Sequence, residues 1–340
     1  MFPGQFTLCL KAIDLEGMRR FYEALGLKVH IDQPTHVLLN NGDVDIALMT
    51  FLEEPSLNFR GADVFQIHEQ FVTAGLDSQN TPQHYKGAQY NITVDGMNWI
   101  RYDPDGNNIF FDTNAGEIGM KGENLALQRV LDATLKRLIN AGATQTSQRA
   151  YRSHIMDRFM PPERRTSTHL GLDTSSLTEP GRFAGDFSLC LSTQDLHAAR
   201  NFYEVLGLEV ENRVVNKRIS MTNGDCRIDL IPAISENWLR FSGSDIFRVY
   251  EQLSASGLRL EGSPQRYSKE ETASFAPGIH WKTRNPDGNT VYFNTAEQAL
   301  TATDHTPPLE AVLKRSLRQL KNINADPECQ ALFESYTDKI

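Results

Sequence analysis

The sequence lacks the features of secreted, membrane-spanning or nucleic-acid-binding proteins. Its four cysteines lie far apart without CxxC spacing, which is typical of free thiols in a reducing compartment rather than of disulfides or a zinc site. No run approaches the roughly 18 apolar residues of a membrane-spanning helix, and the first residues have no signal-peptide pattern. A net charge of −9 argues against nucleic acid or anionic membrane as the partner. We therefore expect a cytoplasmic protein with no nucleic-acid partner and no membrane partner.

Histidine patterns that would hold a metal are missing too. The nine histidines form no HxH, HxxxH or HExxH pair, so we interpret them as surface or hydrogen-bonding residues. His280 is the one to locate first, because it adjoins Trp281 near an expected cleft rim.

The chain does contain a long internal repeat. Matching segments lie 181 residues apart near the start and 182 apart after one extra residue enters the second copy. So many matches at one spacing indicate a tandem duplication. The matches include Gly4–Leu10 with Gly185–Leu191, Phe21–Glu23 with Phe202–Glu204, Asn41–Asp43 with Asn223–Asp225, and Asp103–Asn107 with Asn285–Asn289.

Each copy is predicted to contain two βαβββ units. In the first copy, Asp14 and Asp63 are placed to cap helices that end near Gly26 and Gly75. The pair Asn41-Gly42 predicts a two-residue hairpin turn. The expected strands are Phe6–Leu10, Lys28–Asp32, Thr35–Asn40, Asp43–Thr50, Leu57–Arg60, Pro82–Tyr85, Asn98–Tyr102 and Asn108–Thr113.

The repeat continues into a trailing amphipathic helix. Leu127, Val130, Leu131, Leu135 and Leu138 have helical spacing and recur 182 residues later. This stripe favours an intramolecular pseudo-dimer, with a dimer face between two chains (a homodimer) as the alternative. The stretch from about 144 to 184 is interpreted as a polar connector with one short helix near Tyr151–Phe159.

The motifs that recur in both copies resemble the vicinal oxygen chelate superfamily. They are the helix ending in Phe-Tyr-Glu-x-Leu-Gly-Leu and the turn Asp/Asn-Pro-Asp-Gly-Asn. That superfamily includes glyoxalase I, extradiol dioxygenases and bleomycin-resistance proteins. The resemblance implies an α+β fold in which paired βαβββ units curl a mixed sheet around a cleft. In the enzymes of the family, a divalent metal in this cleft binds two neighbouring substrate oxygens.

The resemblance and the repeat together divide the chain into four parts. These are a first glyoxalase-like domain over 1–117, an amphipathic helix and polar connector over 118–183, a second glyoxalase-like domain over 184–299, and a C-terminal helical segment over 300–340.

Most positions that the family uses for metal ligands hold other residues here. Seven of the eight positions lack a usual ligand, and a divalent ion needs three or four converging donors. We therefore predict no metal and no cofactor. By the resemblance the eight positions are Thr7 and Ser188 (His or Gln), Ser56 and Trp238 (often His), Phe110 and Tyr292 (Glu), and Ala47 and Asp229 (Glu in glyoxalases).

The replacements give the predicted clefts aromatic surface, which suits a flat or apolar small molecule. Cys9 and Cys190 share one repeat position and are interpreted as thiols that line the clefts rather than as nucleophiles. The candidate ligand-binding residues are Thr7, Cys9, Asn58, Arg60, Trp99, Phe110, Ser188, Cys190, Asp229, Trp238, Arg240 and Tyr292.

The resulting hypothesis is a metal-independent protein that binds a small aromatic or amphipathic ligand, comparable to the bleomycin-resistance-like members. Two alternatives stay open. One is a metal-dependent lyase, isomerase or dioxygenase with displaced ligands around Asp229. The other is a non-catalytic interaction scaffold. No catalytic residue is assigned, so the sequence leaves open whether the protein is an enzyme.

Overall fold

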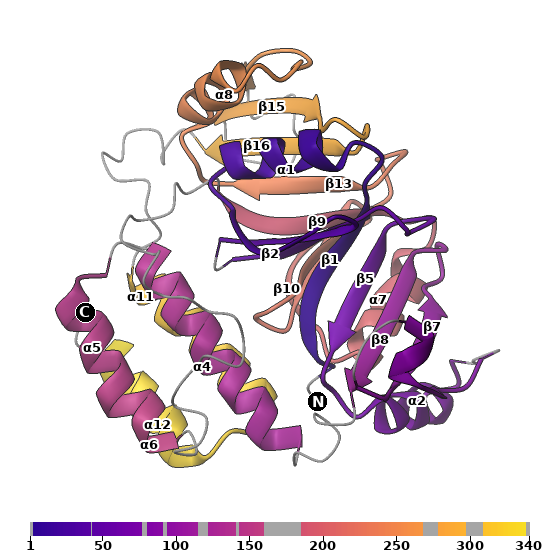
Figure 1. Ribbon diagram of the computed structural model, residues 1–340, viewed down its shortest axis with the longest axis vertical. Coiled ribbons are helices and arrows are strands. Elements are labelled where there is room, and N and C mark those ends of the chain that lie inside the picture. The colour runs from indigo at the N-terminus through magenta and orange to yellow at the C-terminus, as the bar shows by residue number, and fades with distance from the viewer. Residues whose placement is uncertain are drawn as a thin grey trace.

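The chain forms two eight-stranded sheets and a separate layer of helices (Figure 1). This computed structural model describes residues 3–41, 43–76, 80–90, 94–114, 122–140, 143–159, 185–267, 278–296 and 309–337. No helix within these ranges is long and apolar enough to cross a membrane.

The first sheet has the strand order β2-β3-β4-β1-β5-β8-β7-β6. Strands β1 and β5 pair antiparallel at its centre, and each also pairs in parallel with the last strand of its own βαβββ unit. The elements are β1 (Gln5–Lys11), α1 (Leu15–Ala24), β2 (Lys28–Gln33), β3 (His36–Asn40), β4 (Asp45–Met49), β5 (Ser56–Arg60), α2 (Val64–Thr73), β6 (Gln83–Tyr85), η1 (Gly87–Tyr90), β7 (Gly96–Tyr102) and β8 (Asn108–Asn114).

The second sheet repeats this order as β10-β11-β12-β9-β13-β16-β15-β14. Four βαβββ units in two tandem domains confirm the α+β fold expected from the sequence. The elements are β9 (Asp186–Ser192), α7 (Leu196–Val205), β10 (Glu209–Val214), β11 (Arg218–Thr222), β12 (Arg227–Ile231), β13 (Trp238–Ser242), α8 (Ile246–Ala255), β14 (Gln265–Tyr267), β15 (Gly278–Arg284) and β16 (Thr290–Ala296).

The helix ends follow the capping residues read from the sequence. The Asp14 side chain accepts the Gly17 N–H at 2.9 Å, and Asp63 accepts the Gln66 N–H at 3.0 Å. Each carboxylate satisfies a donor that the first helical turn leaves without a partner. Gly26 then reverses the chain after α1 with a φ of +92°, a conformation that side chains with a Cβ rarely adopt.

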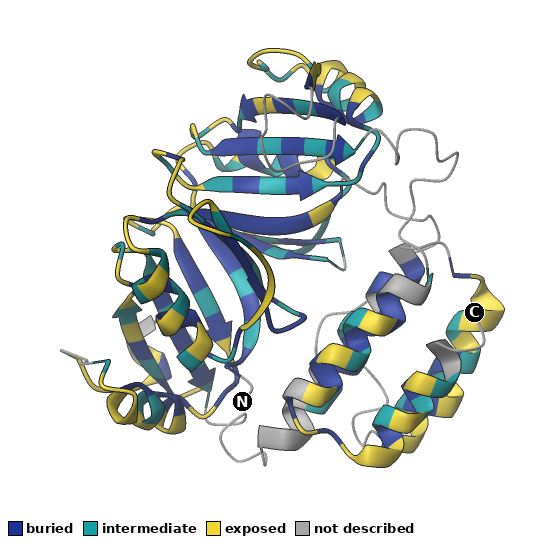
Figure 2. Cartoon of the chain, turned by 180° about the vertical axis from the view of Figure 1, so that it is seen from behind, coloured by how far each residue is buried: buried dark blue, intermediate teal, exposed yellow. Residues whose placement is uncertain are grey.

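Alternation along the strands sends apolar side chains to one side of each sheet, where the helices lie (Figure 2). Phe6 and Leu8 on β1 and their equivalents Phe187 and Leu189 on β9 belong to one continuous core that spans both domains. Helix α7 takes part directly, because Phe202 contacts Phe71 of α2 edge to face at 5.0 Å. The opposite side of each sheet therefore does not belong to this core.

The recurring motifs also join the two domains. The Tyr203 hydroxyl donates to Asp103 at 2.8 Å, and Asn285 donates to the Tyr22 hydroxyl at 3.1 Å. These contacts are equivalent under the repeat, so an approximate two-fold axis relates the domains. In each copy, the tyrosine and the Asp/Asn-Pro-Asp-Gly-Asn turn therefore also make contacts with the other copy.

The Asn-Gly segments differ from the two-residue turn expected. Strand β3 ends at Asn40 and β4 begins at Asp45, so the loop has four residues. The reason is the Asn41 side chain, whose Oδ1 accepts the N–H groups of Asp43 and Val44 and widens the turn. The loop then presents Asp43 to the Phe187 N–H, while Asp225 of the second copy accepts the Phe6 N–H at 2.7 Å.

The trailing helices pair with one another in a helical layer beside the sheets (Figure 1). Thr134 donates to Ser316 at 2.6 Å, and Arg137 donates to Gln319 at 2.6 Å; each pair consists of repeat equivalents. The layer has its own apolar cluster, separate from the core of the sheets. Its elements are α4 (Gly122–Asn140), α5 (Gln145–Tyr151), the π-helix η2 (Arg152–Met156), α6 (Asp157–Phe159), α11 (Leu309–Asn322) and α12 (Pro327–Thr337).

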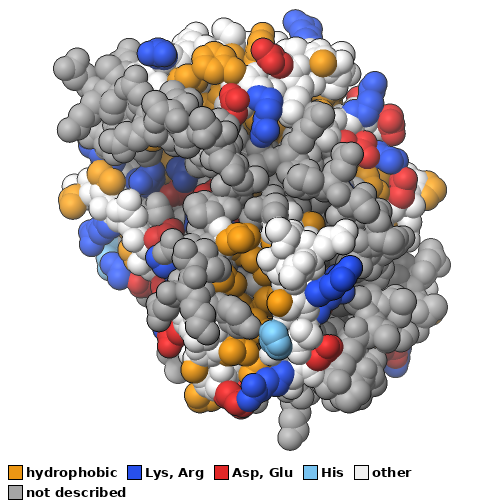
Figure 3. Space-filling view, turned by 90° about the vertical axis from the view of Figure 1, so that its left-hand side faces the viewer, with side chains coloured by type: hydrophobic (Ala, Val, Ile, Leu, Met, Phe, Trp, Pro, Cys, Tyr) orange, Lys and Arg blue, Asp and Glu red, His pale blue; other side chains and the backbone are white. Residues whose placement is uncertain are grey.

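The helical layer extends into the predicted connector. Helix α5 begins at Gln145, where Thr144 caps it by accepting the Ser147 N–H at 3.1 Å. The helical segment is therefore longer than the one predicted near Tyr151–Phe159, because Thr144 caps a helix within the segment expected to be a polar connector. On this side of the molecule, apolar side chains form a band flanked by charged groups (Figure 3). The connector beyond 159 lies outside the described residues.

Candidate functional site

Each sheet has a face turned away from its helices, and these two faces carry the candidate residues. Face 1 lies on the first sheet, where Thr7, Asn58 and Phe110 are in register on β1, β5 and β8. Face 2 lies on the second sheet, where the equivalent register positions are Ser188, Arg240 and Tyr292. By the alternation of side chains, Cys9 and Arg60 belong to face 1, whereas Cys190, Asp229 and Trp238 belong to face 2.

Trp99 does not belong to face 1, which corrects its place among the candidates. Its ring stacks on Phe111 at 5.2 Å and meets Phe71 edge to face, and the residue is 1% exposed. The indole N–H donates to the Asn80 carbonyl at 3.0 Å. Trp99 lies between Asn98 and Ile100, so the strand alternation turns it toward the helices. The His68 ring also packs against this indole, with ring centroids 5.2 Å apart.

Face 1 is largely uncharged at its centre. Ala47 and Cys9 are buried side by side on β4 and β1, and the half-buried Phe110 lies on the same face on β8. Burial raises the pKa of the Cys9 thiol to about 12, and hydrogen bonds with Ser56 and Asn58 offset only part of this.

Charge on face 1 appears only toward its edges. Arg60 is exposed and lies 3.9 Å from Asp112. An exposed ion pair of this kind contributes little to stability. His36 has a lowered pKa, first because of burial and then because of the Arg60 charge, so neutral imidazole is favoured there.

Face 2 has a buried carboxylate at its centre. Asp229 is 0% exposed, and its Oδ2 lies 3.0 Å from Arg240 Nη2. Ser220 donates to Oδ1, and Arg218 Nε lies 3.9 Å from the same oxygen. Burial is also the first cause of a lowered pKa at Arg218. Asp186, the first residue of β9, shares this face; burial raises the pKa of its carboxyl group, and the charges of Arg227 and Arg240 offset part of that effect.

The sequence reasoning missed Arg218 and Ser220. The available signal was cross-strand pairing, because Ser220 stands directly opposite Asp229 in the β11–β12 register and Arg218 is two residues away on the same face. If residues 218–231 are treated as one β-hairpin, Arg218 and Ser220 are both placed beside Asp229.

An aromatic wall stands beside this charged centre. Trp238 and Tyr292 are partly exposed, and their rings lie 5.4 Å apart with planes inclined by 33°. Lys282 Nζ lies 5.0 Å from the Trp238 ring, in cation–π geometry. His280 Nδ1 is 3.3 Å from the Tyr292 hydroxyl, so this histidine belongs to the wall of face 2.

Cys190 lies against the aspartate with its sulfur 4.0 Å from Asp229 Oδ2. Burial raises the pKa of this thiol to about 12, with the neighbouring Arg240 charge only partly offsetting the effect. A nucleophilic cysteine needs a lowered pKa, so neither Cys9 nor Cys190 has the electrostatics of one.

The residues at the family's metal positions do not fit a divalent ion. Within the described ranges, no three His, Cys, Asp or Glu side chains come together. Asp229, the one acidic residue at such a position, already accepts from Ser220 and faces the Arg240 guanidinium. A cation placed there would meet a guanidinium at the distance of an ion pair.

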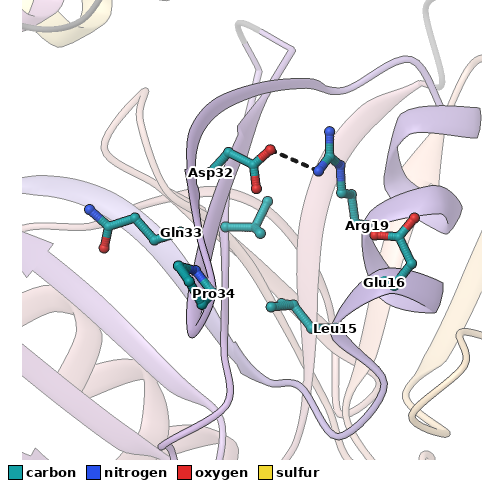
Figure 4. A pocket seen from close by; sticks show the side chains of 7 residues that line it. Leu15, Glu16, Arg19, Asp32, Gln33 and Pro34 are labelled. Carbon is teal, nitrogen blue, oxygen red and sulfur yellow. Dashed lines mark hydrogen bonds and ion pairs between the residues drawn. The ribbon is translucent and has the colours of Figure 1, made fainter.

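A surface hollow of about 440 Å³ lies away from both faces (Figure 4). Helix α1 and the β2–β3 hairpin form it, and Arg19 projects across it to Asp32 at 2.8 Å. Arg19 also pairs with Glu23 at 3.4 Å. Arg19 is thus paired with two carboxylates within this region, and face 2 is the stronger candidate site.

Comparison with known proteins gives similarity only among solved structures; no family model and no curated protein matches. The Mn(II)-bound glyoxalase from Novosphingobium aromaticivorans is 12% identical with a TM-score of 0.48, covering 86% of this chain and 80% of that chain. A catechol 2,3-dioxygenase is 15% identical with a TM-score of 0.47, covering 86% and 87%. The 2,3-dioxygenase LapB from Pseudomonas sp. KL28 is 13% identical with a TM-score of 0.48, covering 86% and 91%.

The paired βαβββ units and their strand order confirm the α+β fold expected from the sequence.

Proposed function

We propose that the protein binds a small aromatic or amphipathic molecule on face 2 without a metal ion. The observation that carries this proposal is the inclined pair Trp238 and Tyr292, partly exposed beside a polar centre. Binding sites commonly combine apolar aromatic walls with a few placed polar groups. Rings stacked on this pair would bury apolar area and gain about 0.5–1.5 kcal/mol beyond it.

The polar groups at the base of face 2 support the same conclusion. Arg240 Nε and Trp238 Nε1 are buried and have no hydrogen-bond partner among the described residues. A buried donor without a partner is costly, and a ligand acceptor is one way to satisfy it. Catalysis is not part of the proposal, because the two thiols on the faces have raised pKa values.

The test uses the position of the three tryptophans. Trp99 and Trp281 are each 1% exposed and donate to backbone carbonyls, so their fluorescence is a constant background. Aromatic compounds that raise the melting temperature in a screen would then be titrated by fluorescence. We expect quenching that disappears in Trp238→Phe.

A matched pair of variants separates the two faces. Tyr292→Leu removes one ring of the wall, whereas Phe110→Leu makes the equivalent change on face 1. We expect Tyr292→Leu to weaken binding about 10-fold, and Phe110→Leu to leave it unchanged. Equal losses in both variants, or stoichiometric metal in the purified protein, would refute the proposal.

A further inference from the structure

Face 2 contains three buried hydrogen-bond donors that have no acceptor. Ser188 Oγ, Trp238 Nε1 and Arg240 Nε are shielded from solvent, and none of them has a hydrogen-bond partner among the described residues. The indole and guanidinium nitrogens can only donate, whereas a hydroxyl can donate or accept. Buried polar groups are nearly always paired in folded proteins, because an unmade hydrogen bond is costly. Three such atoms on one face favour an acceptor that a ligand supplies.

The three donors occupy neighbouring positions of the sheet. Ser188 on β9 stands directly opposite Arg240 on β13, so their Cα atoms are about 5 Å apart. Trp238 precedes Arg240 by two residues, a separation of roughly 7 Å along the same face. Ser188 also interacts with the Cys190 thiol, but sulfur is only a weak acceptor. A single polar group of a ligand could therefore meet more than one of these donors.

The carboxylates of face 2 indicate that this acceptor is uncharged. Asp229 Oδ2 lies 3.0 Å from Arg240 Nη2, and the Asp186 carboxyl on the same face also interacts with the Arg240 charge. The charge of Arg240 is therefore already opposed by carboxylates of the chain itself. A ligand carboxylate placed at the donors would be repelled by both aspartates. A carbonyl oxygen accepts hydrogen bonds without adding this charge.

Face 1 has the opposite hydrogen-bonding character at the equivalent place. Asn58 occupies the position of Arg240, and its buried atom without a partner is Oδ1, which is an acceptor. Ser56 occupies the position of Trp238, so one ring of the aromatic wall is missing there. A carbonyl oxygen would meet a second acceptor on face 1 and three donors on face 2. The expected ligand therefore has one site per chain.

The aromatic wall adjoins the donors. Ser188, Arg240 and Tyr292 stand side by side in one row across β9, β13 and β16. A ring against the wall would thus bring its substituent to the donors. We propose that face 2 binds an uncharged aromatic carbonyl compound, with its ring against Trp238 and Tyr292 and its oxygen accepting from the buried donors. This inference rests on the proposed function and specifies the polar group of its ligand.

The experiment compares 2-acetylnaphthalene with 2-isopropenylnaphthalene, in which a CH2 group replaces the carbonyl oxygen. The two compounds are uncharged and similar in shape, so they differ in the acceptor alone. Affinities for the full chain are measured by calorimetry, directly or by displacement. We expect the ketone to bind with a stoichiometry of one and about 10-fold more tightly than the alkene, because only the ketone gives a buried donor its partner. 2-Naphthoate should bind no more tightly than the ketone.

Variants assign the preference for the ketone to the donors. Ser188→Ala deletes a hydroxyl with little change in volume and should lower the ketone preference by about 3-fold. Trp238→Phe keeps an aromatic ring but deletes the indole N–H, so it provides a second variant with the same expected direction. Thr7→Val, the equivalent deletion on face 1, should leave the ketone preference unchanged. Melting curves check that all three variants are folded.

The outcomes distinguish the two proposals. Equal affinities for the ketone and the alkene, with quenching that still depends on Trp238, would overturn the carbonyl assignment and leave aromatic binding in place. Absence of binding by either compound would count against both proposals. Tighter binding of 2-naphthoate would reveal an anion site, and a ketone preference that persists in Ser188→Ala and in Trp238→Phe would place the oxygen elsewhere. Either of these last two results would overturn this inference alone.

Discussion

Asp225 connects three parts of the molecule, and its replacement makes a quantitative prediction. Its carboxylate accepts the Phe6 N–H of domain 1 at 2.7 Å and the Gln319 side chain of α11 at 3.3 Å. Arg137 of α4, with a side chain 6% exposed, lies 3.5 Å away. In Asp225→Ala the Phe6 N–H loses its acceptor, and a buried guanidinium loses a carboxylate that it faces. Together these losses should cost about 2–4 kcal/mol of unfolding free energy.

Two further variants provide reference values for the loss of unfolding free energy in Asp225→Ala. Asp225→Asn keeps an oxygen for the Phe6 N–H and loses only the charge, so about 1–2 kcal/mol is expected. Asp32→Ala removes a surface carboxylate, 56% exposed, from its pair with Arg19, and should cost less than about 1 kcal/mol.

Urea unfolding followed by circular dichroism measures all three variants under one set of conditions. The expected order of destabilisation is Asp225→Ala, then Asp225→Asn, then Asp32→Ala. A loss below about 1 kcal/mol in Asp225→Ala would mean that this joint contributes no more than a surface ion pair, and would refute the reasoning.

Two other properties can be predicted from burial. Phe333 is 0% exposed in the separate apolar cluster of the helical layer, so Phe333→Ala should cost about 3–5 kcal/mol of unfolding free energy. The helical layer should then unfold at a lower urea concentration than the sheets, and the far-UV and tryptophan transitions would no longer coincide. The four buried thiols should not react with a thiol reagent at pH 8 until urea is added. The pKa of Cys190 rises from 9.0 to about 12 on folding, so at a pH between these two values unfolding releases a proton. The unfolding free energy should therefore fall as the pH rises above 9.0, and a urea midpoint that stays constant over that range would contradict this prediction.

The sequence predicts the fold well because the repeat and the capping residues are local signals. Asp14 and Asp63 are found capping helices where the spacing placed them, and most strand bounds agree within a residue or two. Because of the duplication, the pattern that predicts each element of the sheet domains occurs twice in the sequence. The failure at Asn41 came from a side chain that bonds back to its own loop, a competition that the Asn-Gly pair does not reveal.

The candidate site was harder to predict, because it depends on pairing between strands. Alternation along one strand placed Thr7 with Cys9 and Ser188 with Cys190 on common faces. Trp99 was wrongly placed among the candidates, because its position on the strand turns its side chain to the core. Arg218 was missed because its relation to Asp229 exists only once β11 and β12 are paired.

The joints between the copies account for which positions could diverge after duplication. Tyr22 and Tyr203, like Asp43 and Asp225, are identical in the two copies, and each contacts the other domain. At the turn position the copies do differ, Asp103 against Asn285, but both side chains keep a hydrogen bond with the tyrosine of the other domain. The faces opposite the helices take no part in these joints, so charge could enter one of them alone. The arginines and the aspartate of face 2 lie on the side of the sheet that the joints leave unconstrained, which is where a duplicated scaffold can acquire a binding site without losing its fold.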